Sequence, residues 1–371
     1  MTNDEARALA RLVWEQAAPR ARQGDAAYVR ELGARLAEGL EAAAEQVRLY
    51  GDAFARVVRT LALTPGRDSL VQLIRLLDEH GPSGRSGTDP RLVASLLAEA
   101  QEPADLAELL YDRTERDRLD QLRACLFHEL LLRGVDPEAY PPLRRQATVR
   151  PEGEALSWLP ATLRPFETGA TFPSRSVDGG SGGGWWGLSA VERLDPPTPR
   201  TTERSPLRNI ATTDVHESIV AAPAAGKFGH YDAWVFALDA PLDPVLVPAL
   251  VPTLPMPCVA DLGPTARFEI VRRPPADIWR ILFGMASMGG VYGHGAQGAY
   301  GRRSTWWSLA GLAGAPPGAS AEEVERLVME SAWFHFQCDA EWFHNEIHDY
   351  GIAALSPDGR RLAVLAATDT D

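Results

Sequence analysis

Residues 179–206, GGSGGGWWGLSAVERLDPPTPRTTERSP, separate two parts of the chain that differ in hydrophobic periodicity. Glycine, proline, serine and threonine dominate the stretch, which is typical of loops. Before it, apolar residues recur with helical spacing; after it, short strand-like runs alternate with helical segments. We therefore predict a helical domain at 1–146, a Gly/Pro-rich connecting region at 147–210 and an α+β domain at 211–371.

The first 146 residues show the apolar spacing of amphipathic helices almost throughout. Within residues 30–49, leucines recur every four positions and fall on one helical face. Residues 69–80 repeat this spacing, and Asp89 followed by Pro90 combines an N-cap residue with a proline in the first turn. About six short helices are expected. Because no fixed repeat length is present, the sequence favours a helical bundle or an irregular solenoid.

The C-terminal part mixes both periodicities. Helical spacing occurs in three segments, at 274–288, 305–313 and 321–333. Short runs rich in β-forming residues predict strands at 219–222, 234–238 and 265–272. The chain closes with two apolar runs, 352–355 and 362–367, around the sequence SPDGR, which suits a tight hairpin turn. This alternation predicts an α+β domain.

Charge and cysteine content narrow the classes of function. The 371 residues carry a net charge of −13. Residues 1–150 hold 24 acidic and 21 basic side chains, so the remaining residues contribute −10. This acidity argues against nucleic-acid binding and favours basic protein partners or divalent metals in the C-terminal domain. Three cysteines without CxxC spacing, and no apolar run of membrane-spanning length, predict a cytoplasmic protein that does not bind membranes.

The densest cluster of polar residues lies between Trp333 and Tyr350, in WFHFQCDAEWFHNEIHDY. Imidazoles and carboxylates are general acids and bases and are also metal ligands. A helix would bring two of the histidines onto one face with i, i+4 spacing, whereas a strand would align a H-x-E-x-H set. The zincin motif is not matched, because Asn follows the first histidine of the pair. We predict catalytic residues His335, Asp339 and Glu341, and metal ligands His344, Glu346 and His348.

A second candidate is the glycine-rich run GGVYGHGAQGAYGRR at 289–303. It formally contains GxGxxG, but helical spacing rather than a strand precedes it, so dinucleotide binding is not favoured. Backbone N–H groups at a helix start, together with guanidinium groups, favour an anion instead. The predicted ligand-binding residues are His294, Arg302 and Arg303.

Two acid–histidine pairs are a third candidate. Asp214 with His216, or His230 with Asp232, has the chemistry of the acid and base members of a hydrolase triad. The GxSxG element is missing, and the sequence alone does not show which serine or cysteine lies near either pair.

The last forty residues carry the pairs Trp342-Phe343 and Asp349-Tyr350, the latter before an apolar strand, and then a closing run from Pro357 to Asp371. This tail resembles the close of an uncharacterised family, a domain of unknown function, from high-GC bacteria. The resemblance is limited to the tail and brings no catalytic residues. It implies a role for three residues at the chain end, Thr368, Asp369 and Asp371.

No complete catalytic motif is present, and ten tryptophans with an acidic surface suit protein recognition. The leading hypothesis is a non-catalytic cytoplasmic protein-binding or regulatory protein with a protein partner. The alternative is a metal-dependent, hydrolase-like enzyme whose site lies in the C-terminal domain and uses a divalent metal.

Overall fold

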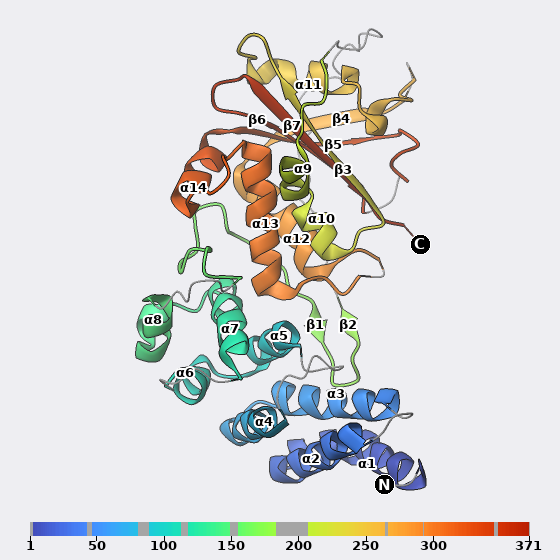
Figure 1. Ribbon diagram of the computed structural model, residues 1–371, viewed down its shortest axis with the longest axis vertical. Coiled ribbons are helices and arrows are strands. Elements are labelled where there is room, and N and C mark those ends of the chain that lie inside the picture. The colour runs from blue at the N-terminus through green and yellow to red at the C-terminus, as the bar shows by residue number, and fades with distance from the viewer. Residues whose placement is uncertain are drawn as a thin grey trace. The chain divides into compact units, whose positions relative to one another are not determined.

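A computed structural model describes the chain at residues 3–42, 47–80, 89–112, 118–148, 155–182, 207–263, 266–291, 293–344 and 348–370. Helices fill the N-terminal part and a sheet with helices fills the C-terminal part, which confirms the predicted α+β class (Figure 1). The chain divides into two compact units: unit 1 comprises 1–157 and 173–183, and unit 2 comprises 158–172 and 184–371. The predicted domain limits, 1–146, 147–210 and 211–371, stay predictions.

Unit 1 is built from helices that pack on helices one or two positions away in chain order. They are α1 (Asn3–Arg22), α2 (Ala26–Ala42), α3 (Val47–Leu63), α4 (Arg67–His80), α5 (Pro90–Ala100), α6 (Pro103–Tyr111), α7 (Asp120–Leu132), the 3-10 turn η1 (Pro137–Ala139) and α8 (Pro141–Thr148). Close pairs include α1 with α3, α2 with α3, and α5 with α7. At α5, the expected cap forms, since the Asp89 side chain accepts the N–H of Arg91.

A two-stranded hairpin, β1 (Ser174–Arg175) and β2 (Ser181–Gly182), also belongs to unit 1. Its turn is fixed to α3 by two arginines. Arg56 pairs with Asp178, and Arg59 Nε donates to the carbonyl of Val177 at 3.0 Å. The hairpin is therefore held by charge and hydrogen bonds rather than by an apolar face.

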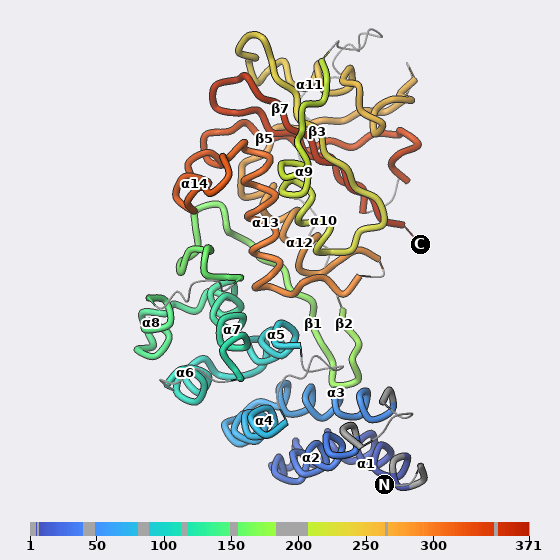
Figure 2. Tube along the Cα trace, viewed as in Figure 1, coloured from blue at the N-terminus to red at the C-terminus, as the bar shows by residue number. Residues whose placement is uncertain are grey.

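Unit 2 contains a five-stranded sheet and helices α9 to α14, which Figure 2 traces along the chain. The strands are β3 (His230–Ala237), β4 (Phe268–Arg273), β5 (Ala332–Cys338), β6 (Tyr350–Leu355) and β7 (Arg361–Thr368). The helices are α9 (Thr213–Ile219), α10 (Ala221–Gly226), α11 (Val247–Leu250), α12 (Pro275–Met288), α13 (Gln297–Ala313) and α14 (Ala321–Glu330). Three 3-10 turns flank α11: η2 (Pro244–Leu246), η3 (Val251–Thr253) and η4 (Pro257–Val259).

The sheet is antiparallel throughout, in the order β3-β7-β6-β5-β4, so β3 and β4 form its edges. One face carries a core cluster in which Phe236, Phe334 and Phe336 pack against the proline-rich segment around α11. Helices α9, α10, α12 and α13 lie on the other side of the sheet (Figure 1). The sheet is thus the middle of three layers and buries both of its faces.

The structure differs from the predicted helices and strands at three places. Residues 219–222, predicted as a strand, lie in α9 and α10, because Thr212 caps α9 by accepting the N–H of Val215 at 3.4 Å. The helix predicted at 305–313 begins earlier, at Gln297. The helix predicted at 321–333 ends at Glu330, and Trp333 already lies in β5. The predicted helix at 274–288 and the closing hairpin are confirmed.

The packing of β6 against β5 depends on one glycine. Gly351 pairs with Phe336, and a Cβ at Gly351 would lie 2.4 Å from that ring. We expect Gly351→Ala to lower the free energy of unfolding by about 1–3 kcal/mol, because the ring has to move within a packed core. Urea denaturation measures the loss. Gly263→Ala is the matched control, since its Cβ would meet no atom within 4 Å; an equal loss in both variants would contradict the steric explanation.

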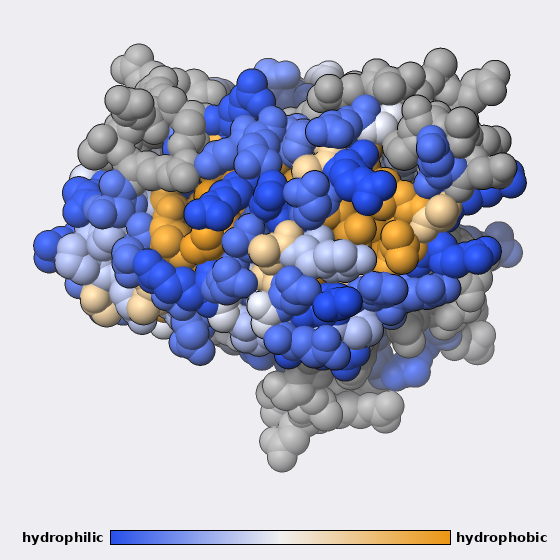
Figure 3. Space-filling model, turned by 90° about the horizontal axis from the view of Figure 1, so that it is seen from below, coloured by the Kyte–Doolittle hydropathy of each residue, from blue (hydrophilic) through white to orange (hydrophobic). Residues whose placement is uncertain are grey.

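Large apolar side chains that stay exposed are few among the described residues. They are Trp14, Leu163, Ile210, Val245, Leu246, Val291, Trp307 and Met329. On the face of the molecule seen in Figure 3, hydrophilic residues predominate and hydrophobic residues gather in two separate areas. Scattered exposed apolar residues are ordinary, so only neighbouring ones that share a fixed backbone carry information about function.

Candidate functional site

One end of the sheet in unit 2 collects many of the predicted residues. β5 ends at Cys338 and β7 ends at Thr368, while β3 begins at His230 and β6 begins at Tyr350. Because His230 pairs with Thr368, these strand ends lie together. The connecting segments that contain His348 and the C-terminal residues therefore meet at the same end of the sheet.

Asp369, at this end, clamps two loops. Its Oδ1 accepts the N–H of Gly229 at 2.8 Å, and its Oδ2 accepts the N–H of Val291 at 2.5 Å. A Cβ at Gly290 would lie 2.0 Å from Oδ2, so only glycine allows this approach. Asp369 is 7% exposed. Asp369 thus holds the glycine-rich loop against the start of β3, while the role that the tail resemblance implies for it stays a prediction.

A second buried carboxylate lies beside the clamp. The hydroxyl of Thr368 donates to Oδ1 of Asp349 at 2.6 Å, and both residues are buried. The carbonyl of Asp349 accepts from Nε2 of Gln337 at 3.3 Å. Sequence reasoning placed Asp349 in the polar cluster but gave it no role, because its partner lies on another strand.

Aromatic rings and imidazoles surround these carboxylates. The rings of His230 and Trp342 are 4.5 Å apart between centroids. Phe228 meets both His348 and Tyr350 edge-on at 6.3 Å. Such contacts fix the orientation of the rings and exclude water.

His335 lies in β5 between Phe334 and Phe336, so its side chain points away from the core cluster, toward the helical layer. Its Nε2 is buried and has no hydrogen-bond partner among the described residues. Burial of the ring, together with the positive charge of Arg273, lowers the pKa of His335 from 6.5 to about 4, and Asp277 opposes this shift. The imidazole is therefore neutral at physiological pH.

The pKa of His335 predicts a pH dependence of stability. The unfolded chain takes up a proton on this histidine near pH 6.5, and the folded chain only near pH 4. The stability that the neutral ring contributes is thus present above about pH 6.5 and is lost as the pH falls toward about 4. We expect a loss of about 2 kcal/mol, after allowing for partial exposure of the ring. Denaturant titrations of the wild type and His335→Gln across this range measure it; parallel curves would contradict the assignment.

The other two predicted catalytic residues lie beyond the end of β5. Asp339 Oδ2 accepts the N–H of Arg267 at 3.0 Å, and the N–H of Glu341 donates to Oδ2 of Asp261 at 2.7 Å. Both Asp339 and Glu341 are exposed. Their catalytic roles, and that of His335, stay predictions.

The structure describes only two of the three residues of the metal site predicted at His344, Glu346 and His348. His344 is exposed and His348 is half-buried, in the connection between β5 and β6, and Glu346 lies outside the described residues. Among the residues that are described, no group of three His, Cys, Asp or Glu side chains is placed to hold a metal ion. The metal hypothesis stays a prediction, which metal analysis of protein purified without chelator tests.

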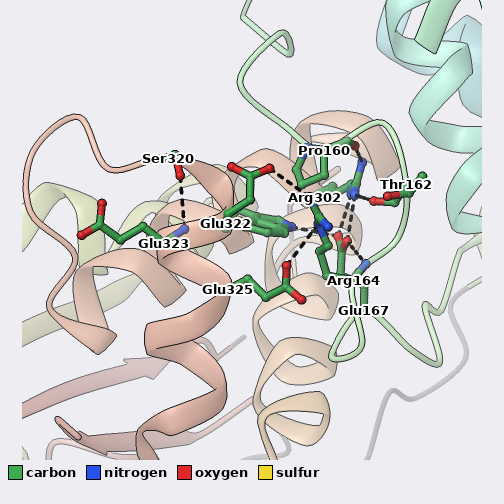
Figure 4. A network of polar contacts seen from close by, with 10 residues as sticks. Pro160, Thr162, Arg164, Glu167, Arg302, Ser320, Glu322, Glu323 and Glu325 are labelled. Atoms are coloured by element: carbon green, nitrogen blue, oxygen red, sulfur yellow. Dashed lines mark hydrogen bonds and ion pairs between the residues drawn. The ribbon is translucent and has the colours of Figure 1, made fainter. Parts of the chain in front are cut away.

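Arg302, a predicted ligand-binding residue, is fully buried and binds an anion from its own chain (Figure 4). Its Nε and Nη2 donate to the two carboxylate oxygens of Glu167 at 2.6 and 2.8 Å. It also donates to the carbonyls of Pro160 and Thr162 at 2.9 and 3.0 Å. Glu167 further accepts from the indole of Trp306 at 2.8 Å. This network fastens residues 158–172 to α13, while binding of an external anion by Arg302 stays a prediction.

The remaining two predicted ligand-binding residues lie nearer the surface. The Arg303 guanidinium is 4.4 Å from the ring centroid of Tyr300 and 4.5 Å from that of Trp307. His294 is exposed, in the loop before α13, and its carbonyl accepts from Nε2 of Gln297 at 3.1 Å. The three predicted residues of the glycine-rich run therefore have three different surroundings.

The two acid–histidine pairs expected from the sequence are replaced by a third combination. Nε2 of His216 and Oδ1 of Asp232 are 2.8 Å apart, between α9 and β3. Both side chains are more than a third exposed. The nearby hydroxyl of Ser218 donates to the carbonyl of Trp307 at 2.9 Å. The pair is thus a hydrogen bond between two side chains at the surface, and such exposed pairs contribute little to stability.

A feature that sequence reasoning missed lies at the opposite end of the sheet. Val245 and Leu246, here called the apolar tip, are 73% and 52% exposed in the turn η2. The Asp243 side chain accepts the N–H of Val245 at 2.9 Å, and the N–H of Leu242 donates to the carbonyl of Gly359 at 2.8 Å. The available signal was Asp-Pro before two aliphatic residues, an N-cap followed by a fixed first turn.

Comparison with known proteins adds a family but no activity. A family model described as "Family of unknown function (DUF6183)" matches residues 11–371. This match is far wider than the C-terminal tail on which the resemblance rested. No curated protein and no solved structure matches the chain significantly. In the part of the chain that the structure describes, no helix has the length and apolarity that crossing a bilayer requires.

Proposed function

The chain belongs to DUF6183, a family of unknown function, along nearly its whole length, and from its structure we propose a non-catalytic protein-binding or regulatory protein that docks a partner on the apolar tip. The observation that carries this proposal is the exposure of Val245 and Leu246 on a backbone that is fixed by hydrogen bonds. Two adjacent aliphatic side chains that are mostly exposed contribute little to the stability of the monomer, but they provide apolar area to a partner.

The fixed backbone supports docking in particular. The N–H of Leu246 donates to the carbonyl of Asp243 at 2.9 Å, and Pro244 restricts the turn further. Val247, the next residue, is fully buried and anchors the turn to the core. Because the tip is already ordered, a partner would not have to order it on binding, which lowers the entropic cost of association.

The cytoplasm is the compartment that we propose with this function. Cys125, Cys258 and Cys338 all carry free thiols and are buried. Burial raises the pKa of Cys338 to about 11, which keeps it a protonated, unreactive thiol. Free thiols of this kind are usual in reducing compartments.

The test is affinity capture from the native host with two matched variants. We expect the wild type to retain at least one protein that Val245→Ser/Leu246→Ser loses by about tenfold or more, since burial of two aliphatic side chains contributes more than 1.4 kcal/mol. Met329→Ser is the control, because Met329 is 47% exposed but lies in α14. Quantitative mass spectrometry compares the captured proteins.

The stability of the tip variant is measured alongside. Substitution of exposed residues should change the free energy of unfolding by less than about 0.5 kcal/mol, so loss of binding then reports on the surface itself. If every captured protein is retained equally by the wild type and the tip variant, the proposed docking site is wrong.

A further inference from the structure

We infer that the partner of the apolar tip carries basic residues around an apolar contact, an inference that rests on the proposed function. Three aspartates, Asp239, Asp243 and Asp358, lie in the two turns that hold the tip, and all three are exposed. Their positions relative to the tip follow from hydrogen bonds between the turns.

The two turns are joined at two points. Nη1 of Arg360 donates to the carbonyl of Asp239 at 2.8 Å, and the N–H of Leu242 donates to the carbonyl of Gly359. A Cβ at Gly359 would lie 2.9 Å from the carbonyl oxygen of Leu242, so the turns are in direct contact. Asp358 therefore belongs to the same surface as Asp243, which caps the tip.

Hydrogen bonds stabilise the ionised form of one of these carboxylates, that of Asp358. The hydroxyl of Ser356 and the N–H of Arg360 donate to Oδ1 of Asp358, and these hydrogen bonds lower the pKa of Asp358. Within the segments 238–246 and 356–360, Arg360 is the single basic residue against three aspartates. The surface around the tip is therefore acidic.

The charge of the surrounding region acts in the same direction. Residues 211–371 contain 19 Asp and Glu against 10 Lys and Arg, a net charge of −9. A negative field around an apolar contact attracts a basic partner and increases its association rate. It also repels an anionic membrane surface, so a protein segment is favoured over a lipid bilayer.

The probe for this inference is a random linear peptide library displayed on phage and selected against the full-length chain. Peptides that the wild type binds and Leu246→Ser loses define the tip-dependent set. We expect this set to be enriched in Lys and Arg next to apolar residues, and its affinity to fall about tenfold as salt rises from low to high concentration.

Neutralisation of the aspartates separates charge from shape. Asp239→Asn/Asp243→Asn/Asp358→Asn keeps the side-chain oxygens that cap the turns, and we expect it to weaken the tip-dependent peptides about tenfold. The control makes the same charge change elsewhere: Asp52→Asn/Asp214→Asn/Glu217→Gln should leave affinity within about twofold.

Each outcome has a distinct meaning. If the tip-dependent peptides are neutral or acidic, or if they bind the triple variant with unchanged affinity, the inference of a basic partner is wrong. The proposed function is not affected by that result. If no peptide depends on Leu246, the proposed function fails and the inference fails with it. If no peptide depends on the tip, but vesicles of anionic and zwitterionic lipid bind in a Leu246-dependent way, the partner is a membrane and not a protein. That result also contradicts the inference.

Discussion

Replacement of Glu167 by alanine is expected to lower the free energy of unfolding of unit 2 by about 3–5 kcal/mol, because it leaves the charge of Arg302 buried without its carboxylate. Both side chains are 0% exposed and are joined by two hydrogen bonds. The indole of Trp306 would also lose its acceptor. Guanidinium chloride denaturation, followed by tryptophan fluorescence, measures the loss.

A matched ion pair at the surface provides the control. Arg164 contacts Glu322 at 3.2 Å, and the Glu322 side chain is 72% exposed. We expect Glu322→Ala to cost less than about 1 kcal/mol, because solvent already screens that pair. Comparable losses for Glu167→Ala and Glu322→Ala would contradict the argument from burial.

A double substitution tests the same point from the other side. Arg302→Met/Glu167→Leu removes both charges and keeps apolar volume, so it should cost less than Glu167→Ala alone. A double variant as unstable as Glu167→Ala would show that packing of residues 158–172, rather than an unpaired charge, determines the loss.

Local sequence signals were sufficient to predict those helices and strands whose limits are determined by residues next to them in the chain. The helix predicted at 274–288 is α12, because its apolar spacing is continuous and a proline begins it. The hairpin at the chain end is β6 and β7, because Pro-Asp-Gly determines the turn between two apolar runs. The limits of α14 and β5 were less well predicted, since the residues around Trp333 suit a helix and a strand equally.

The contacts of the candidate site could not be predicted from local sequence signals, because they join residues that are far apart in the sequence. Arg302 and Glu167 are 135 residues apart in sequence, and Glu167 lies in a segment without regular structure. Arg302 was predicted to bind an external anion, which stays a prediction; in the structure its partner is an internal carboxylate, that of Glu167. The apolar tip was missed because exposure of Val245 depends on how the turn projects from the core, which apolar spacing alone does not show.

Replacement of Asp369 by alanine is expected to lower the free energy of unfolding by about 2–4 kcal/mol, because two backbone N–H groups lose their acceptor at a buried position. Those donors, Gly229 and Val291, lie 140 and 78 residues away in sequence, so the carboxylate joins three segments. Hydrogen exchange resolves the effect: the amide of Val291 should exchange faster, ahead of global unfolding.

Two further variants separate the clamp from a general effect at the chain end. In Asp369→Asn, one side-chain oxygen remains as an acceptor, while the amide NH2 group faces the other backbone N–H. The free energy of unfolding of this variant should therefore lie between those of the wild type and Asp369→Ala. Asp339→Ala also removes a carboxylate that accepts a backbone N–H, that of Arg267, but at an exposed position, and should cost less than about 1 kcal/mol. If Asp369→Ala is no less stable than Asp339→Ala, or if exchange at Val291 is unchanged, Asp369 does not hold the glycine-rich loop. The clamp would then be an incidental contact of the last strand, and the role implied by the tail resemblance would have to lie elsewhere.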